Sequence, residues 1–419
     1  MKQRHGVLAI CLALTITVQV AVATKRESAD LWVGSWATAE QVPESANALP
    51  PADLRDATLR QIVHLSIGGK WLRIVFSNAF GRTSLRLTSA HIAAAVAPGS
   101  SKIEVSTDRP LTFSGRPDVV IPAGAEYVSD PVAFDAAPLS NLAITIHIAQ
   151  PAQGETSHPG SRTTSYLVAG DRVTEAALPG AMKFDHWFYI AGVEVLAPPQ
   201  AAAIVALGDS ITDGHASTTN GNNRWPDDLA RRLLHAMPNR PLGVLNEGIG
   251  GNRLLHDGLG PNALARFDRD VLAQPGVRYL IVLEGINDIG TFGLTGHRSP
   301  AAHRALVRRI IAAYRQIILR AHEHGIRVFG GTITPFVGSD YYHPSPLSEA
   351  DRQAVNRWIR APGHFDGVID FDKVVRDPKH PDRLLPAYDS GDHLHPSPRG
   401  YQAMANAIPL SLFSPSASR

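Results

Sequence analysis

A serine, an aspartate and a histidine stand out for their types and their positions. Ser210 follows the apolar run 201–207, and Asp392 and His395 lie three residues apart near the C-terminus. This spacing allows the Asp392 carboxylate to reach one ring nitrogen of His395 while the other nitrogen faces Ser210. The histidine can then remove the serine proton, and the serine can attack a carbonyl carbon. These residues predict nucleophilic catalysis, with Ser210 as nucleophile.

Such a serine needs hydrogen-bond donors for the oxyanion that its attack creates. Gly251 has no side chain to block its backbone N–H, and Asn287 offers a side-chain amide. The backbone N–H of Ser210 is a third candidate. We expect the nearby Asp209 and Asp288 to fix loop geometry by accepting backbone hydrogen bonds.

The elements that must position these residues begin after residue 200. Apolar runs alternate there with helical patterns, which indicates a parallel sheet covered on both faces. Strands are expected at 202–207, 242–246, 279–283, 327–332 and 368–371, and helices at 226–237, 260–271, 299–324, 348–360 and from Pro398 past Met404. Parallel strands carry their carboxyl ends to one edge of the sheet. The polar segments 208–210, 246–252, 284–288 and 391–396 should therefore meet in one crevice.

The first half of the chain has a different pattern. Segments rich in β-branched and aromatic residues, separated by turns, predict strands at 58–67, 71–77, 85–96, 103–106, 127–134, 141–148 and 187–195. Many short strands indicate a β-sandwich or jelly-roll-like domain. Because 419 residues exceed one ordinary core, we expect a β-domain at 24–197, a joint at 197–200 and an α/β domain at 201–413.

Composition bounds the class of protein. Residues 1–23 read as a signal peptide with a basic start and an apolar run, which predicts a secreted or periplasmic protein without a stable membrane anchor. Loss of Lys2 and Arg4 with that segment would leave equal numbers of basic and acidic side chains, and no basic stripe indicates nucleic-acid binding. The single cysteine, Cys11, lies in the leader, so no disulfide is expected.

Four segments together resemble the sequence blocks of the SGNH, or GDSL, hydrolase superfamily. They are Gly-Asp-Ser at 208–210, the glycine of the second block at Gly251, Gly-Ile-Asn-Asp at 285–288 and Asp-His-Leu-His at 392–395. Ile211 stands where the family usually has leucine. The resemblance implies a flavodoxin-like three-layer α/β/α fold, esterase activity and no metal or other cofactor.

The resemblance also implies roles for the site residues. Ser210 would be the nucleophile, His395 the general base and acid, and Asp392 its orienting partner, with Ser210, Gly251 and Asn287 forming the oxyanion hole. The first half of the chain is similar to the N-terminal β-domain of some secreted members, including carbohydrate esterases.

Several alternatives stay open from the sequence alone. The expected substrate is a small-molecule or glycan ester, and a secreted β-domain protein favours acetyl groups on an extracellular carbohydrate. A broad short-chain esterase or lysophospholipase-like lipase is the competing enzyme. A carbohydrate-binding or adhesion protein with a vestigial hydrolase domain is an alternative of another class. The oligomeric state cannot be read from the sequence.

Two further groups of residues have a structural and a functional interpretation. His-x-His pairs at 322–324 and 393–395 have a spacing seen in metal sites, but no fixed carboxylate cluster accompanies the first pair. We therefore expect no metal. Five aromatic residues are candidates either for packing or for lining a substrate pocket, namely Trp225, Phe292, Phe336, Tyr341 and Tyr342.

Overall fold

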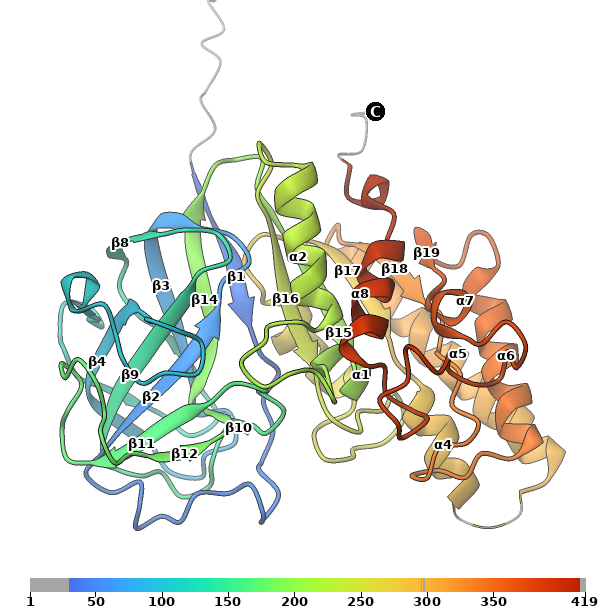
Figure 1. Ribbon diagram of the computed structural model, residues 1–419, viewed down its shortest axis with the longest axis horizontal. Helices are drawn as coiled ribbons and strands as arrows, with labels where there is room; N and C mark the ends of the chain where they lie inside the picture. Colours follow the sequence, from blue (N-terminus) through green and yellow to red (C-terminus); the bar gives the residue numbers. More distant parts are fainter. Residues whose placement is uncertain (1–29, 295, 297, 415–419) are drawn as a thin grey trace, which may run out of the picture.

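The computed structural model describes residues 30–294, 296 and 298–414, so the predicted signal peptide lies outside the described residues. Two parts of the chain lie side by side (Figure 1). Antiparallel strands fill residues 31–197, and a parallel sheet with helices follows from residue 202. The predicted combination of a β-domain and an α/β domain is confirmed. None of the helices in the described part of the chain is long and apolar enough to span a membrane.

The β-domain consists of two antiparallel sheets that face each other across an apolar core. One sheet contains β1 (Leu31–Ala37), β14 (Ile190–Ala197), β3 (Gly69–Ser77), β7 (Glu126–Val128) and β8 (Val132–Ala136). The other contains β12 (Met182–Phe184), β11 (Ser165–Ala169), β2 (Ala57–His64), β9 (Asn141–Gln150), β4 (Leu85–Ala94), β5 (Arg109–Pro110) and β6 (Val119–Ile121). Alternate residues of β9, including Ile144 and Ile146, are fully buried because they point between the sheets. A small ladder joins β10 (Ser157–His158) to β13 (Trp187–Phe188).

The sequence placed most long strands correctly but misjudged short ones. The predicted strand 103–106 is wrong, because Ile103 forms only an isolated bridge to Ala95 and η1 (Val105–Thr107) is a 3₁₀ turn. The predicted strand 127–134 is two strands, β7 and β8, that pair with different parts of β3. The strands β1 and β11 were not predicted. Short strands depend on their partners more than on their own sequence.

The α/β domain has one parallel sheet in the order β16 (Leu242–Gly248), β15 (Ala202–Gly208), β17 (Val277–Leu283), β18 (Arg327–Gly331) and β19 (Gly367–Ile369). This is the flavodoxin-like order 2-1-3-4-5, with the first strand at the point where the order reverses. The strand β15 is buried along its whole length, as its run of small and apolar residues predicted.

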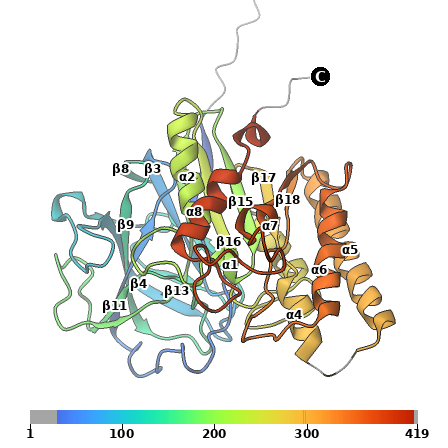
Figure 2. The same ribbon diagram turned by 45° about the vertical axis from the view of Figure 1, so that its right-hand side comes forward.

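Helices cover both faces of this sheet, as the three-layer prediction requires. On one face α2 (Trp225–Ala236) packs against α8 (Pro398–Ala407), and on the other α5 (Pro300–Glu323) packs against α6 (Pro346–Arg360) (Figure 2). The short helices are α1 (Ser210–Asp213), α3 (Ala263–Phe267), α4 (Ile286–Leu294) and α7 (Phe371–Val375), with a 3₁₀ turn, η3 (Leu410–Phe413), after α8.

The helices show two differences from the sequence prediction. The helix expected at 260–271 begins at Ala263, after the Asn262 side chain accepts a hydrogen bond from Ala265 N–H, and continues as the π-helical turn η2 (Asp268–Leu272). The helices α1, α4 and α7 were not predicted. They begin directly at polar strand ends, where glycine and aspartate indicated loops.

The two domains are joined through β1 and β16. The Ser66 hydroxyl accepts a hydrogen bond from Val244 N–H at 2.9 Å, and Thr38 forms a parallel bridge with Asn246. A Cβ atom at Gly243 would lie 2.0 Å from the Gly34 carbonyl oxygen. The two backbones approach this closely only because residue 243 is a glycine.

We expect Gly243→Ala to lower the free energy of unfolding by about 1–3 kcal/mol, since a methyl group forced against a backbone atom has the cost of overpacking. Thermal and urea unfolding would measure the change. The control is Gly293→Ala, because a Cβ there meets only the Ser348 hydroxyl at 3.5 Å. Equal stability of the two variants would contradict the close approach of β1 and β16.

Candidate active site

The register of the parallel sheet brings the predicted loops together. Gly208 at the end of β15 pairs with Gly248 of β16 on one side and with Leu283 of β17 on the other. The segments that follow these three residues therefore leave the sheet side by side. Ser210 begins α1, and the Asp209 side chain caps that helix by accepting a hydrogen bond from Ile211 N–H at 2.9 Å.

Ser210, His395 and Asp392 form a continuous chain of hydrogen bonds. The Ser210 Oγ lies 2.8 Å from His395 Nε2, and His395 Nδ1 lies 2.6 Å from Asp392 Oδ2. A carboxylate can only accept, so Nδ1 donates to Asp392 and Nε2 has the lone pair that accepts the serine proton. The structure thus brings together the three residues that the sequence singled out. Ser210 and His395 are buried, with 8% and 4% exposure.

Asp392 is held in its charged form by its hydrogen bonds. Burial raises the pKa of Asp392, but hydrogen bonds from the His395 side chain and from the backbone N–H groups of His395 and Leu394 outweigh it. The pKa of Asp392 therefore lies well below its usual range. This carboxylate can orient His395 and stabilise it once it has taken a proton.

The Asn287 side chain is fixed in one orientation next to the loop of Gly251. Its Nδ2 donates to the Asn252 carbonyl at 2.8 Å, and its Oδ1 accepts from the Tyr342 hydroxyl at 2.5 Å. Because a carbonyl only accepts, the first contact identifies the amide nitrogen. Gly251 itself has φ +67°, a left-handed conformation that favours glycine. The sequence did not identify Tyr342 as a partner of Asn287.

A buried arginine connects the strand ends beneath the site. Arg266 donates to the carbonyls of Gly208 and Glu247 at 3.0 and 2.7 Å, and to the Asn252 side chain at 3.0–3.1 Å. It also pairs with Asp270 at 2.9 Å. No motif pointed to Arg266, since its role depends on a side chain that reaches from α3 to the ends of β15 and β16 and to the loop of Asn252.

The two aspartates next to the site residues hold loops, as predicted. Asp288 accepts from the N–H groups of Leu254 and Leu255 at 2.8 and 3.0 Å, and Asp209 caps α1. Burial raises the pKa of Asp209 to about 7 and that of Asp288 to about 6, although these hydrogen bonds act in the opposite direction.

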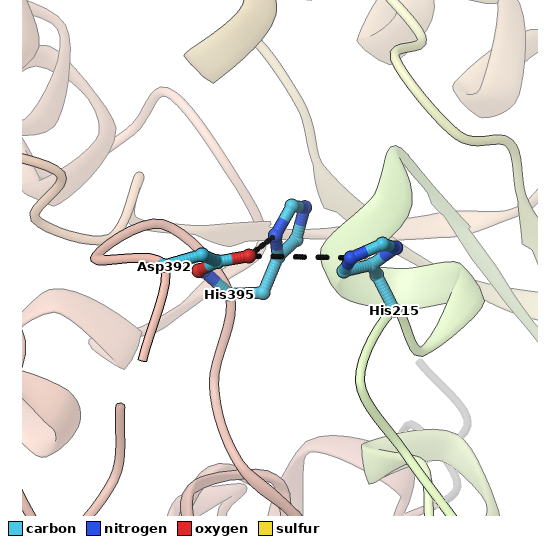
Figure 3. Close-up of side chains that lie close together, drawn as sticks. All are labelled: His215, Asp392 and His395. Carbon is cyan, nitrogen blue, oxygen red and sulfur yellow. Dashed lines mark hydrogen bonds and ion pairs between the residues drawn. The ribbon is translucent and has the colours of Figure 1, made fainter. Parts of the chain in front are cut away.

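His215 is a member of the site that sequence reasoning missed. Its ring centroid lies 4.1 Å from that of His395, and its Nε2 lies 4.0 Å from Asp392 Oδ2 (Figure 3). On its other side, Nδ1 lies 2.9 Å from a guanidinium nitrogen of Arg162, which belongs to the β-domain. The only sequence signal was a histidine five residues after Ser210.

His215, Asp392 and His395 also form a cluster whose ligand atoms lie within 4.8 Å of one another, a spacing that a metal ion could bridge. A guanidinium only donates, so Arg162 takes the Nδ1 lone pair of neutral His215 and places the hydrogen on Nε2. His395 uses both nitrogens on Asp392 and Ser210. The cluster therefore has no imidazole lone pair to offer a metal, and its donors fit acid–base chemistry.

The histidine pairs that suggested metal sites have carboxylate partners. His322 Nε2 lies 2.8 Å from Asp366 Oδ2, and His393 Nδ1 lies 2.6 Å from Asp389 Oδ2. Within the described ranges neither His322 nor His393 belongs to a three-ligand cluster, whereas His395 belongs to the cluster with His215 and Asp392 described above.

The five aromatic candidates differ in burial and in their contact with the site. Trp225 and Phe336 are fully buried, Phe292 packs edge-on against His303, and Tyr342 packs against the core and holds Asn287. Tyr341 is 52% exposed, and its ring meets that of His395 edge-on at 5.8 Å. Tyr341 alone among them combines exposure with contact to the site.

The comparisons with known proteins concern the α/β domain. Residues 206–403 match the family model described as GDSL-like Lipase/Acylhydrolase family. The C-terminal domain belongs to this family. The match assigns residues 206–403, the GDSL domain, to the SGNH superfamily, as the sequence blocks predicted, and it supports a carboxylic ester hydrolase. A search of curated proteins found no match.

Solved structures similar to the GDSL domain include a GDSL-like lipase from Bacteroides thetaiotaomicron (17% identity, TM-score 0.36, covering 50% of this chain and 87% of that one). An α/β hydrolase from the metagenome of Lake Arreo has 22% identity and a TM-score of 0.37, with 50% and 94% covered. An acetylxylan esterase from Geobacillus stearothermophilus has 20% identity and a TM-score of 0.38, with 52% and 97% covered.

The raised pKa of Asp209 predicts a pH effect on stability. Between about pH 4, the pKa of an unfolded aspartate, and about pH 7, the folded protein binds this proton more tightly, so stability falls as pH rises. Asp209→Asn keeps an oxygen that accepts from Ile211 N–H and removes the ionisation. We expect its melting temperature, relative to the wild type, to be higher at pH 8 than at pH 5.

The measurement is thermal unfolding of both proteins across this pH range. Asp118→Asn is the control, because Asp118 lies on the β-domain surface with Arg116 and Arg86 as its ion-pair partners. A difference between wild type and Asp209→Asn that does not change with pH would contradict a raised pKa.

Proposed function

We propose that the protein is a secreted serine esterase that hydrolyses short acyl esters through an acyl-serine intermediate. The observation that carries the proposal is the unbroken chain from Ser210 Oγ through His395 to Asp392, with distances of 2.8 and 2.6 Å. These are hydrogen-bond distances at which a proton can pass from the serine to the imidazole.

The reaction has two steps. His395 Nε2 takes the Ser210 proton while Oγ attacks the ester carbonyl carbon, and Asp392 stabilises the imidazolium. When the tetrahedral intermediate collapses, the bond to the leaving oxygen breaks and His395 protonates the alkoxide. Water then gives a proton to His395 and attacks the acyl-serine, which releases the acid and regenerates Ser210.

The oxyanion is stabilised by the backbone N–H groups of Ser210 and Gly251 and by Asn287. Tyr342 and Asn252 hold the Asn287 amide in place, so its second N–H can donate to the oxyanion without moving during the reaction. Donors that are already fixed stabilise the oxyanion more than mobile donors do, because they need no reorganisation when its negative charge develops.

The substrate we propose is an acetyl or other short acyl ester, with an extracellular carbohydrate as its alcohol part. Tyr341 supports this choice, since an exposed aromatic ring beside the general base offers a face to a sugar or an aryl group. Leu259, which is 52% exposed, lies over Gly251 and offers a small apolar contact. Secretion rests on the sequence of residues 1–23.

Hydrolysis of p-nitrophenyl esters from acetate to dodecanoate tests the proposal. We expect activity to peak at acetate and Ser210→Ala to lose more than about 10³-fold in kcat, since only oxyanion stabilisation and binding then remain. Ser140→Ala is the control, because the Ser140 hydroxyl contacts only the Ala137 carbonyl in a β-domain turn. Acetylated xylooligosaccharides are the second substrate series.

In the p-nitrophenyl ester series, a preference for long acyl chains would contradict the short-acyl assignment and favour a lipase. Activity that survives in Ser210→Ala would contradict the serine mechanism.

Asn287→Ala tests the oxyanion hole. Loss of one donor should lower kcat about 10²–10³-fold while KM changes little, because the donor acts mainly on the transition state. Asn239→Ala, an exposed position after α2, is the matched control. Circular dichroism and thermal unfolding would verify folding, and an unchanged kcat would remove Asn287 from the oxyanion hole.

A further inference from the structure

A loop of the β-domain extends into the site. His158 at the end of β10 contacts Asp213 of α1 at 3.0 Å, and a Cβ on Gly160 would collide with the Asp213 carboxylate. Two residues further, Arg162 adopts φ +51°, and its carbonyl accepts from Asn220 N–H at 2.8 Å. The loop is therefore fixed against the segment that follows Ser210.

Arg162 determines the hydrogen positions on His215. The guanidinium is always charged and only donates, so His215 Nδ1 must accept at the 2.9 Å contact. In the neutral ring the hydrogen then lies on Nε2, the nitrogen 4.0 Å from Asp392 Oδ2. The same ring packs against His395 at 4.1 Å.

The groups around His215 have opposing effects on its charge. His395 and Arg162 disfavour a positive charge on it, whereas Asp392 and Asp213 favour one. The Tyr401 hydroxyl of α8 contacts only the His215 backbone carbonyl, at 2.7 Å. Burial is the largest effect, and with the two cationic neighbours it lowers the pKa of His215 to about 4.

We propose that Arg162 of the β-domain is a positioning residue of the active site, which keeps His215 neutral with its Nε2–H toward Asp392. His395 is then the one imidazole of the pair that takes a proton during turnover. The inference rests on the proposed serine mechanism for its kinetic consequence, but not for the state of His215 itself. The β-domain would then contribute a residue, Arg162, that positions a side chain of the active site.

The physical reason lies in the competition for Asp392. A protonated His215 would be a second cation beside the same carboxylate and would weaken the stabilisation of His395 when His395 takes the serine proton. With Arg162 in place this competition is absent above about pH 5. Without Arg162 one of the effects that lower the pKa of His215 is gone, so this pKa should rise, although burial and His395 still lower it.

The first experiment observes His215 directly. Long-range ¹H–¹⁵N spectra of ¹⁵N-histidine-labelled protein, with His215→Gln to assign the signals, report which ring nitrogen carries a hydrogen. In the wild type we expect a neutral ring with the hydrogen on Nε2 from pH 5 to 8. In Arg162→Met we expect the ring to take up its proton at higher pH than in the wild type and the hydrogen to be shared between Nδ1 and Nε2, and a titration and tautomer unchanged from the wild type would overturn the proposal.

The second experiment measures kcat/KM for p-nitrophenyl acetate against pH. The acidic limb of the wild type should follow one proton, and that of Arg162→Met should steepen toward two, because His215 then takes up its proton at higher pH. The double variant Arg162→Met/His215→Gln should return to one proton. An unchanged acidic limb in Arg162→Met would overturn the proposal.

Controls distinguish an effect of Arg162 on His215 from a loss of folding and from a failure of the esterase assignment. Arg116→Met, at a β-domain side chain that is 74% exposed, should behave as the wild type in both experiments. Thermal unfolding verifies that Arg162→Met folds. If Ser210→Ala retains activity the proposed function fails, whereas the spectra of His215 still decide whether Arg162 sets its protonation.

Discussion

The guanidinium of Arg266, which has no exposed surface, holds the strand ends on which the active site is built. It donates to the Gly208 and Glu247 carbonyls and to the Asn252 side chain, and Asp270 balances its charge. A buried charge needs partners on every side, so these groups have little freedom to move. Ser210 follows one of these strand ends, and Asn252 in turn accepts from Asn287.

The site depends on both domains. The ends of the parallel strands bring Ser210 close to the loops of Gly251 and Asn287, and the segment before α8 supplies Asp392 and His395. The β-domain meets this arrangement through the close contact of β1 with β16 and through the loop of Arg162. The β-domain is therefore part of the structure around the reaction centre, and its removal would expose His215 and the turn after α1.

The order of strands explains why a short sequence motif was informative. Gly-Asp-Ser directly after a fully buried strand places the serine at the switch point of a 2-1-3-4-5 sheet. The same rule predicted that the loops after β16 and β17 lie beside it. By contrast, the polar strand ends did not reveal the bounds of the short helices α1 and α4, because such helices depend on caps like Asp209 at the start of α1.

By itself, the sequence determined the two fold classes and the long buried strands and helices, and it named Ser210, Asp392, His395, Gly251 and Asn287 as candidate site residues, because those features depend on local periodicity and on motifs at strand ends. Only the tertiary structure revealed the roles of Arg162, His215 and Arg266, and the contact of Tyr342 with Asn287. Arg162 and His215 lie 53 residues apart in the chain, and Tyr342 and Asn287 lie 55 apart. Contacts of this kind leave no spacing to read, since they arise only when separate elements pack together.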